Sequence, residues 1–140
     1  MKHILYVADD IQPLASGKLL TVGLYPDAVI MMHMPPDAPT VSLDAPAGMA
    51  TLCLLLTVTG LPLGDSLYEG TLLLPDGATS TPAAPLQHVS VNGQDPVNVI
   101  HKFAPFLVPQ IGTYTLISKF KDVELRSTFE VRRGVPLTST

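Results

Sequence analysis

The clearest pattern of hydrophobic and polar positions lies near the C-terminal end of the chain. In residues 113–121, and again in residues 123–131, side chains that are apolar apart from Ser118 and Ser127 recur at every second position. A period of two predicts strands with one side on a core and the other in water. Lys121-Asp122 leaves room only for a tight turn, so the two strands should form a β-hairpin that ends the domain. The core residues predicted from this pattern are Leu116, Phe120, Leu125, Phe129 and Val131.

The rest of the chain consists of short β-rich runs separated by Gly, Pro and Asp, without a heptad, an amphipathic helix or a fixed-period repeat. The prolines of residues 35–49 and 78–85 predict two loops. This pattern predicts an all-β fold, a two-sheet antiparallel β-sandwich of about eight strands, immunoglobulin-like or C2-like. A closed barrel is the alternative. Besides the hairpin, the expected strands are 2–8, 17–24, 28–34, 50–59, 66–74, 86–91 and 97–107.

A chain of 140 residues is long enough for one domain with a single core. We expect residues 1–131 to form a single β-sandwich domain, because the last alternating pattern ends there. Residues 132–140 carry no such pattern, and we expect them to form a flexible C-terminal tail.

The composition is apolar, with 46% hydrophobic and only 14% charged residues, and the formal net charge is −4. An average domain is about a quarter charged. Because acidic residues outnumber basic ones, we expect no nucleic-acid partner and no membrane partner. There is no apolar run of ~18 residues that could form a transmembrane helix. The N-terminal apolar run is too short for a secretion signal, so we expect a cytoplasmic protein.

Two of the expected strands, 2–8 and 50–59, are partly apolar on both sides. Ile4 and Tyr6 lie on one side of the first, and Leu5 and Val7 on the other. A sandwich core can take only one side of each strand, so the other side needs a cover. The 35–49 loop could supply it within a monomer. A second subunit could also supply it, and we therefore expect a homo-oligomer, most simply a two-fold homodimer.

The chain contains no phosphate-binding loop, no dinucleotide fingerprint, no zinc-protease helix motif and no nucleophile elbow. No two of its histidines lie within four residues of each other, so there is no local zinc half-site. The only cysteine, Cys53, lies in an apolar run and is expected to be a small buried side chain. We therefore predict no catalytic residue and no cofactor. The histidines are His3, His33, His88 and His101.

Several aspartates fall in predicted loops or at strand ends, where some sandwich domains bind calcium. No Asp-x-Asp-x-Asp run is present, and single aspartates often cap turns through their own backbone. We therefore predict no metal ligands. A weak candidate loop cluster is nevertheless formed by Asp9, Asp10, Lys18, Tyr25 and Asp27.

The N-terminal residues 4–10, the Gly17-Lys18 step and the segment 22–25 form a recognisable series with two C-terminal motifs, residues 112–114 and 129–131. This series resembles a family of small uncharacterised bacterial and phage proteins. They open with a hydrophobic strand, an acidic pair, a Gly-Lys step and a Gly-Leu-Tyr segment. They close with Gly-x-Tyr and Phe-x-Val strands. The family has no assigned activity, so the resemblance implies a fold and little else.

The function expected from these observations is a non-enzymatic binding or assembly module that acts through sheet edges and loops. Its partner would be another protein or a second copy of the chain. One alternative is a metal-dependent, calcium-type ligand-binding β-sandwich. The other is an enzyme whose site the sequence does not reveal.

Overall fold

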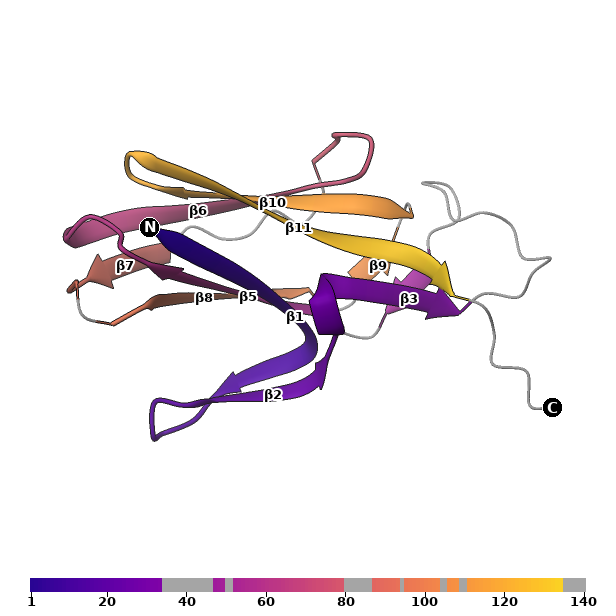
Figure 1. Ribbon diagram of the computed structural model, residues 1–140, viewed down its shortest axis with the longest axis horizontal. Helices are drawn as coiled ribbons and strands as arrows, with labels where there is room; N and C mark the ends of the chain where they lie inside the picture. The colour runs from indigo at the N-terminus through magenta and orange to yellow at the C-terminus, as the bar shows by residue number, and fades with distance from the viewer. Residues whose placement is uncertain are drawn as a thin grey trace.

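The computed structural model describes residues 1–33, 47–49, 52–79, 87–93, 95–103, 106–108 and 111–134. This part of the chain is all-β, and most of its strands form two sheets that face each other (Figure 1). The first sheet has the order β2-β1-β5-β8 and the second β3-β11-β10-β6-β7. The strands of the first sheet are β1 (Lys2–Pro13), β2 (Leu19–Leu24), β5 (Leu52–Thr59) and β8 (Val97–Phe103). Those of the second are β3 (Val29–His33), β6 (Gly64–Leu73), β7 (Gln87–Val91), β10 (Gly112–Phe120) and β11 (Val123–Gly134).

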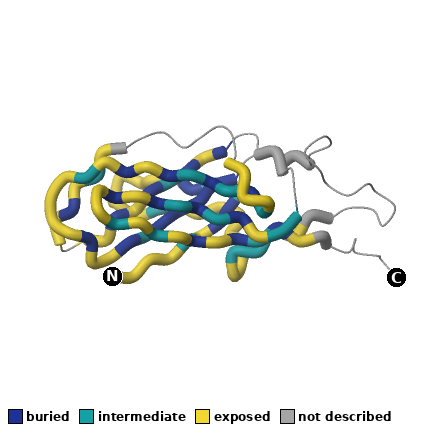
Figure 2. The backbone as a smooth tube through the Cα atoms, turned by 90° about the horizontal axis from the view of Figure 1, so that it is seen from above, coloured by how far each residue is buried: buried dark blue, intermediate teal, exposed yellow. Residues whose placement is uncertain are grey.

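The core lies between the two sheets, where buried segments of both gather (Figure 2). From the first sheet it takes side chains such as Val7, Leu54 and Leu56. From the second it takes large side chains such as Tyr114 and Phe129, whose rings stack with centroids 5.1 Å apart. Burial of alternate residues on facing strands is the main source of stability for such a fold.

The predicted C-terminal hairpin is confirmed. Strands β10 and β11 pair antiparallel from Gly112↔Val131 to Phe120↔Val123, with Lys121 and Asp122 in the turn. Lys121 has a positive φ of 43°, which the tight turn requires. Of the five predicted core residues, four are fully buried and Leu125 is partly buried.

The strand count and the pairing differ from the prediction. The described residues contain eleven strands rather than about eight. The predicted strand 97–107 is divided into β8 and β9 (Phe106–Val108), and β9 pairs with β4 (Ala47–Met49), which lies in the predicted loop 35–49. The remainder of that loop, and most of the predicted loop 78–85, lie outside the described residues. The sheets are also not wholly antiparallel, because β3 pairs parallel with β11.

The last strand continues past the predicted end of the domain. Strand β11 runs on to Gly134, and its final residues pair with β3 from Arg132↔Met31 to Gly134↔His33. The first three residues of the predicted tail therefore belong to the second sheet. Alternation alone could not reveal this extension, because β3 supplies the pairing. The rest of the predicted tail, 135–140, lies outside the described residues.

The N-terminal strand is longer than predicted and turns back as a hairpin. Strand β1 continues to Pro13, and its second half pairs with β2 from Ala8↔Leu24 to Pro13↔Leu19. Asp9 and Asp10 therefore lie within strand β1. The sequence had predicted a loop or a strand end at these positions. Beyond Leu24 the chain forms a short 3-10 turn, η1 (Pro26–Ala28), and crosses to β3 in the second sheet. The β1–β2 hairpin lies below the body of the two sheets in Figure 1.

Candidate functional site

The candidate site is the β1–β2 hairpin, whose turn is built by local sequence. Leu14 N–H donates to Lys18 O at 2.8 Å, and Gly17 N–H donates to Leu14 O at 3.0 Å. Gly17 has a φ of 85°, a conformation that L side chains rarely adopt. This pattern is that of a short hairpin loop with a glycine in the left-handed position. Lys18 is exposed at the end of this loop.

A tyrosine fixes the other end of the hairpin. Tyr25 O–H donates to Asp9 Oδ1 at 2.7 Å, and Tyr25 N–H donates to Val7 O at 2.8 Å. Gly23 makes room for this contact, because a Cβ at that position would lie 2.7 Å from Asp9 Cγ. Partial burial, and then the Asp9 carboxylate, raise the pKa of Tyr25 to about 12. The Asp9–Tyr25 pair thus holds the point at which the chain leaves β2 for the second sheet.

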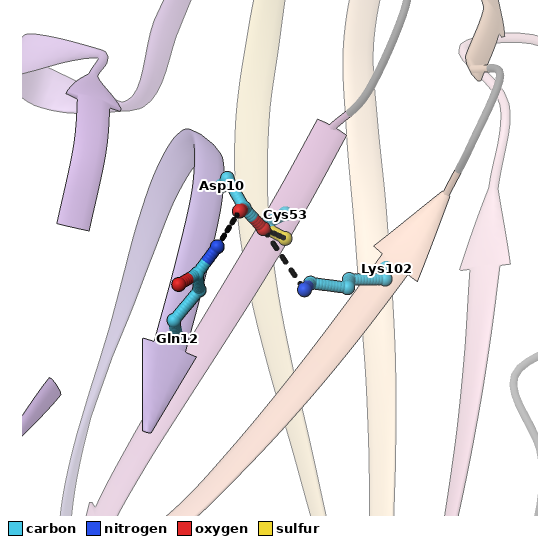
Figure 3. A network of polar contacts seen from close by, with 4 residues as sticks. All are labelled: Asp10, Gln12, Cys53 and Lys102. Carbon is cyan, nitrogen blue, oxygen red and sulfur yellow. Dashed lines mark hydrogen bonds and ion pairs between the residues drawn. The ribbon is translucent and has the colours of Figure 1, made fainter. Parts of the chain in front are cut away.

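Asp10 makes a separate set of contacts with two other strands (Figure 3). Its carboxylate lies 2.9 Å from Lys102 Nζ on β8 and accepts a hydrogen bond from Gln12 Nε2 at 2.7 Å. Cys53 Sγ on β5 lies 3.7 Å from the same carboxylate. The Lys102 contact is the main cause that lowers the pKa of Asp10, and Asp10 in turn raises the pKa of Lys102. Burial raises the pKa of the Cys53 thiol, which disfavours a reactive thiolate.

The hairpin covers the outer side of the first sheet. Ile11 packs with Ala8, Cys53 and Leu55 in a separate apolar cluster, against which Leu19 and Ile100 also pack. Cys53 is buried, as predicted, and Leu55 is 7% exposed. The cover that the sequence required for strand 50–59 is therefore supplied, at least here, by the chain's own hairpin. Neither the 35–49 loop nor a second subunit is needed at this position.

The hairpin leaves its own apolar side chains exposed. We define the β2 patch as Tyr6 of β1 and Leu20, Val22 and Leu24 of β2. Their exposed fractions are 40%, 45%, 49% and 53% respectively. Strand β2 is an edge of the first sheet, and among the described residues it pairs only with β1. Strand β2 contains no charged residue. The nearest charged residues along the chain are Lys18 before it and Asp27 after it.

The predicted loop cluster is therefore divided by the structure. Asp9 and Tyr25 are brought together by a hydrogen bond, whereas Asp10 contacts Lys102. Lys18 and Asp27 are exposed at opposite ends of β2. Asp9 and Asp10 separate because adjacent residues of a strand point to opposite sides. The sequence predicted a cluster of loop carboxylates in this region, whereas the exposed feature of the hairpin is an apolar strand.

Sequence reasoning did not single out a buried polar group at the centre of the core. Tyr68 on β6 lies with its hydroxyl 2.5 Å from His101 Nε2 on β8 and 3.1 Å from Ser118 Oγ on β10. Burial lowers the pKa of His101 to about 4 and is the main cause that raises the pKa of Tyr68 to about 12. The available signal was the position of His101 in the alternating series Val97, Val99, His101 and Phe103.

This group combines a hydroxyl with an imidazole but lies inside the core. Tyr68 and Ser118 are 0% exposed and His101 is 3% exposed. His101 Nδ1 has no hydrogen-bond partner within the described part of the chain. A nucleophile and base must reach a substrate, and these side chains face only the packed interior. The arrangement therefore joins the two sheets through polar contacts, and it does not form an accessible catalytic site.

Two surface depressions lie at the same end of the sheets. A cavity of about 80 Å³ is bordered by Leu61, Leu63 and Phe120 and by the Lys121-Asp122 turn. A wider groove of about 310 Å³ lies beside β7 and β8, where His88, Asn92 and Asp95 border it. Two of its polar groups are engaged with each other, because Asn92 Nδ2 donates to Asp95 Oδ2 at 2.9 Å. The smaller cavity holds little more than a few water molecules, whereas ligand pockets are usually several hundred Å³.

The aspartates do not gather at one place in the described ranges. Asp65 accepts a hydrogen bond from Ser90 Oγ at 2.8 Å, and Asp76 accepts one from Ala78 N–H at 2.9 Å. No three His, Cys, Asp or Glu side chains of the described residues are arranged to hold a metal ion. Within the same residues there is also no helix with the length and apolar character needed to cross a membrane.

Comparison with known proteins adds no functional assignment. No protein-family model matches the chain, and no curated protein matches it in sequence. The resemblance to a family of bacterial and phage proteins therefore stays a prediction.

Proposed function

We propose that this protein is a non-enzymatic binding or assembly module that acts through the β2 edge of its first sheet. The observation that supports this proposal most strongly is the β2 patch. Its apolar side chains are about half exposed, along a strand that has a free edge among the described residues. Such an edge offers main-chain hydrogen bonds and alternate apolar side chains to an added strand.

Natural proteins usually protect an edge strand with charged residues, prolines or very short length. Strand β2 spans six residues and has neither a charged residue nor a proline. The opposite edge of the same sheet, β8, carries Lys102, which is paired with Asp10. The lack of protection at β2 therefore favours an edge that is covered when the protein functions.

The other functions considered from the sequence receive less support. A calcium-type ligand site would require converging carboxylates, but Asp9, Asp10 and Asp65 each serve different contacts. An enzyme would require an accessible reactive group, and the Tyr68–His101 pair is buried. A location in the cytoplasm is part of the same proposal and rests on the sequence alone.

We propose an immunoglobulin-like type for the sandwich. The support is the strand order, β1-β5-β8 in one sheet and β11-β10-β6-β7 in the other. Immunoglobulin-like domains have strands A, B and E in one sheet and G, F and C in the other. The strands of this chain match that order when β1, β5 and β8 are taken as A, B and E, and β11, β10 and β6 as G, F and C. The β2 edge is then an addition next to strand A.

The proposal is tested by capture with matched variants. A tagged and an untagged copy of the chain are produced together in the native cell, and retained proteins are identified by mass spectrometry. Val22→Lys places a charge in the β2 patch. Leu67→Lys is the control, because Leu67 is 47% exposed on another strand, β6. Both variants should unfold in urea at the wild-type midpoint, since both side chains are exposed.

We expect a defined partner to be retained by the wild type and by Leu67→Lys. Val22→Lys should reduce that retention at least tenfold. The partner could be the untagged copy or a different protein, and either result supports the proposed function. If no retained protein depends on Val22, the β2 edge is not a binding site and the proposal is wrong.

A further inference from the structure

We infer that the partner of the β2 edge is a second copy of this chain, paired antiparallel through β2 about a two-fold axis at Val22. This inference rests on the proposed function and specifies its partner. A two-fold axis perpendicular to the sheet pairs residues of the same side, so each apolar side chain meets an apolar side chain of the other copy.

The sequence of β2 is self-complementary in the antiparallel direction. Its outward apolar positions are Leu20, Val22 and Leu24, a series that reads the same in both directions about Val22. Pairing about Val22 places Leu20 of each copy opposite Leu24 of the other and the two Val22 residues opposite each other. A centre at Thr21 would place Leu24 opposite the charged Lys18, which precedes the strand. The pattern therefore selects Val22 as the centre.

The charges that flank β2 favour the same arrangement. Lys18 lies four residues before Val22, and Asp27 lies five residues after it. Antiparallel pairing about Val22 brings Lys18 of each copy toward Asp27 of the other, twice in the dimer. Parallel pairing would instead place the two Lys18 residues side by side. Opposite charges near an interface select orientation and register.

The area of the β2 patch suits a concentration-dependent dimer. Its exposed fractions correspond to roughly 400 Å² per copy, which is in the range of the largest apolar patch on a typical monomer. The two patches together expose roughly 800 Å², and pairing through β2 covers only a part of this surface, because Tyr6 lies one strand inward on β1. Interfaces of this size belong to the weak or transient class. We therefore expect a dimer that dissociates on dilution.

Disulfide cross-linking tests the register directly. Opposite residues of antiparallel strands have Cα atoms about 4.5–5.5 Å apart, which a disulfide can bridge. Val22→Cys should therefore form a disulfide-linked dimer under mild oxidation. The wild type should not, because its Cys53 is fully buried. Leu67→Cys is the matched exposed thiol outside the patch.

The neighbouring positions separate this register from others. In a dimer centred on Val22, the two residues at position 20 are roughly 13 Å apart, beyond the reach of a disulfide. Leu20→Cys and Leu24→Cys should each remain unlinked alone, and their equimolar mixture should form a linked heterodimer. Reduced samples of all variants should melt in urea like the wild type.

Linking of Val22→Cys and of the mixture, without linking of Leu67→Cys, supports the inference. Failure of Val22→Cys to link at concentrations where the protein is associated overturns it. Capture of a different protein in a Val22-dependent manner, with a chain that stays monomeric, also overturns it. In that last case the proposed function is still supported, so the two failures can be told apart.

Discussion

The hydroxyl of Tyr68 lies 2.5 Å from Nε2 of His101 and joins the second sheet to the first through the centre of the core. Ser118 Oγ lies 3.1 Å from the same hydroxyl, so three strands contribute to one polar group. Gly70 makes room for it, because a Cβ there would lie 2.6 Å from His101 Cε1. Buried polar groups of this kind stabilise a fold only while their charge state and their packing are kept.

The neutral state of His101 predicts loss of stability in acid. Burial lowers the pKa of His101 from its ordinary 6.5 to about 4 in the folded protein. Between these values the unfolded chain binds a proton that the folded chain does not. Stability is therefore complete above pH 6.5 and falls as the pH is lowered toward 4, by up to about 3 kcal/mol. Urea melts across this range measure the slope.

His101→Gln should flatten this slope between pH 6.5 and 4, whatever its effect on absolute stability. His88→Gln is the control, because it makes the same substitution at an exposed histidine outside the Tyr68–His101 contact. An equal slope in the wild type and in His101→Gln would show that His101 is protonated in the folded state.

Gly70→Ala should destabilise the protein by about 1–3 kcal/mol, because the added methyl group overpacks the Tyr68–His101 contact. Two of the three nearest atoms belong to His101. The same substitution made in a His101→Ala background should therefore have a smaller effect. A double-mutant cycle in urea provides the measurement, and additive effects would place the strain elsewhere.

Phe129→Ala should lower the free energy of unfolding by about 3–5 kcal/mol, since Phe129 is fully buried and stacks on Tyr114. Thr128→Ala is the control on the exposed side of the same strand and should change stability by less than about 0.5 kcal/mol. A loss below about 1 kcal/mol for Phe129→Ala would mean that this side of β11 does not face the core.

Tyr25→Phe should lower the free energy of unfolding by about 1 kcal/mol at neutral pH, because it removes the hydrogen bond to Asp9. Tyr6→Phe, at an exposed tyrosine of β1, should have little effect.

The raised pKa of Tyr25 also predicts how stability changes with pH in alkaline solution. The folded state retains the phenol proton between pH 10 and about 12, so the contribution of Tyr25 to stability is lost as the pH rises through that range. If Tyr25→Phe and Tyr6→Phe have the same free energy of unfolding in urea, the Asp9–Tyr25 hydrogen bond does not stabilise the fold.

The sequence predicted the β-sheet character and the last hairpin because their signal is local. Phe129 and Val131 alternate with Thr128 and Glu130, and that alternation alone assigns their sides. The extension of β11 to Gly134 could not be predicted in this way, because its cause is pairing with β3, about one hundred residues earlier in the chain.

The sequence singled out residues of the β1–β2 hairpin as a cluster of loop carboxylates, whereas the structure shows an exposed apolar strand there. The acidic residues Asp9 and Asp10 drew attention to the N-terminal region. Whether they shared a site depended on the length of β1, which continues through both aspartates to Pro13. The sequence also predicted that an apolar side of strand 50–59 needed a cover. It could not show that Ile11 and Leu19 provide that cover. As a result, β5 is buried on this side, and the exposed apolar side chains lie on β2 instead.

The measurement that tests self-association through β2 most directly is sedimentation equilibrium at micromolar concentration. The wild type and Leu67→Lys should show a reversible equilibrium between a species of 14.9 kDa and one of twice that mass. Val22→Lys should remain at 14.9 kDa at every concentration, because two charged residues would meet at the two-fold axis. A wild-type protein that sediments as a single 14.9 kDa species throughout, or a Val22→Lys variant that associates as the wild type does, would contradict the account.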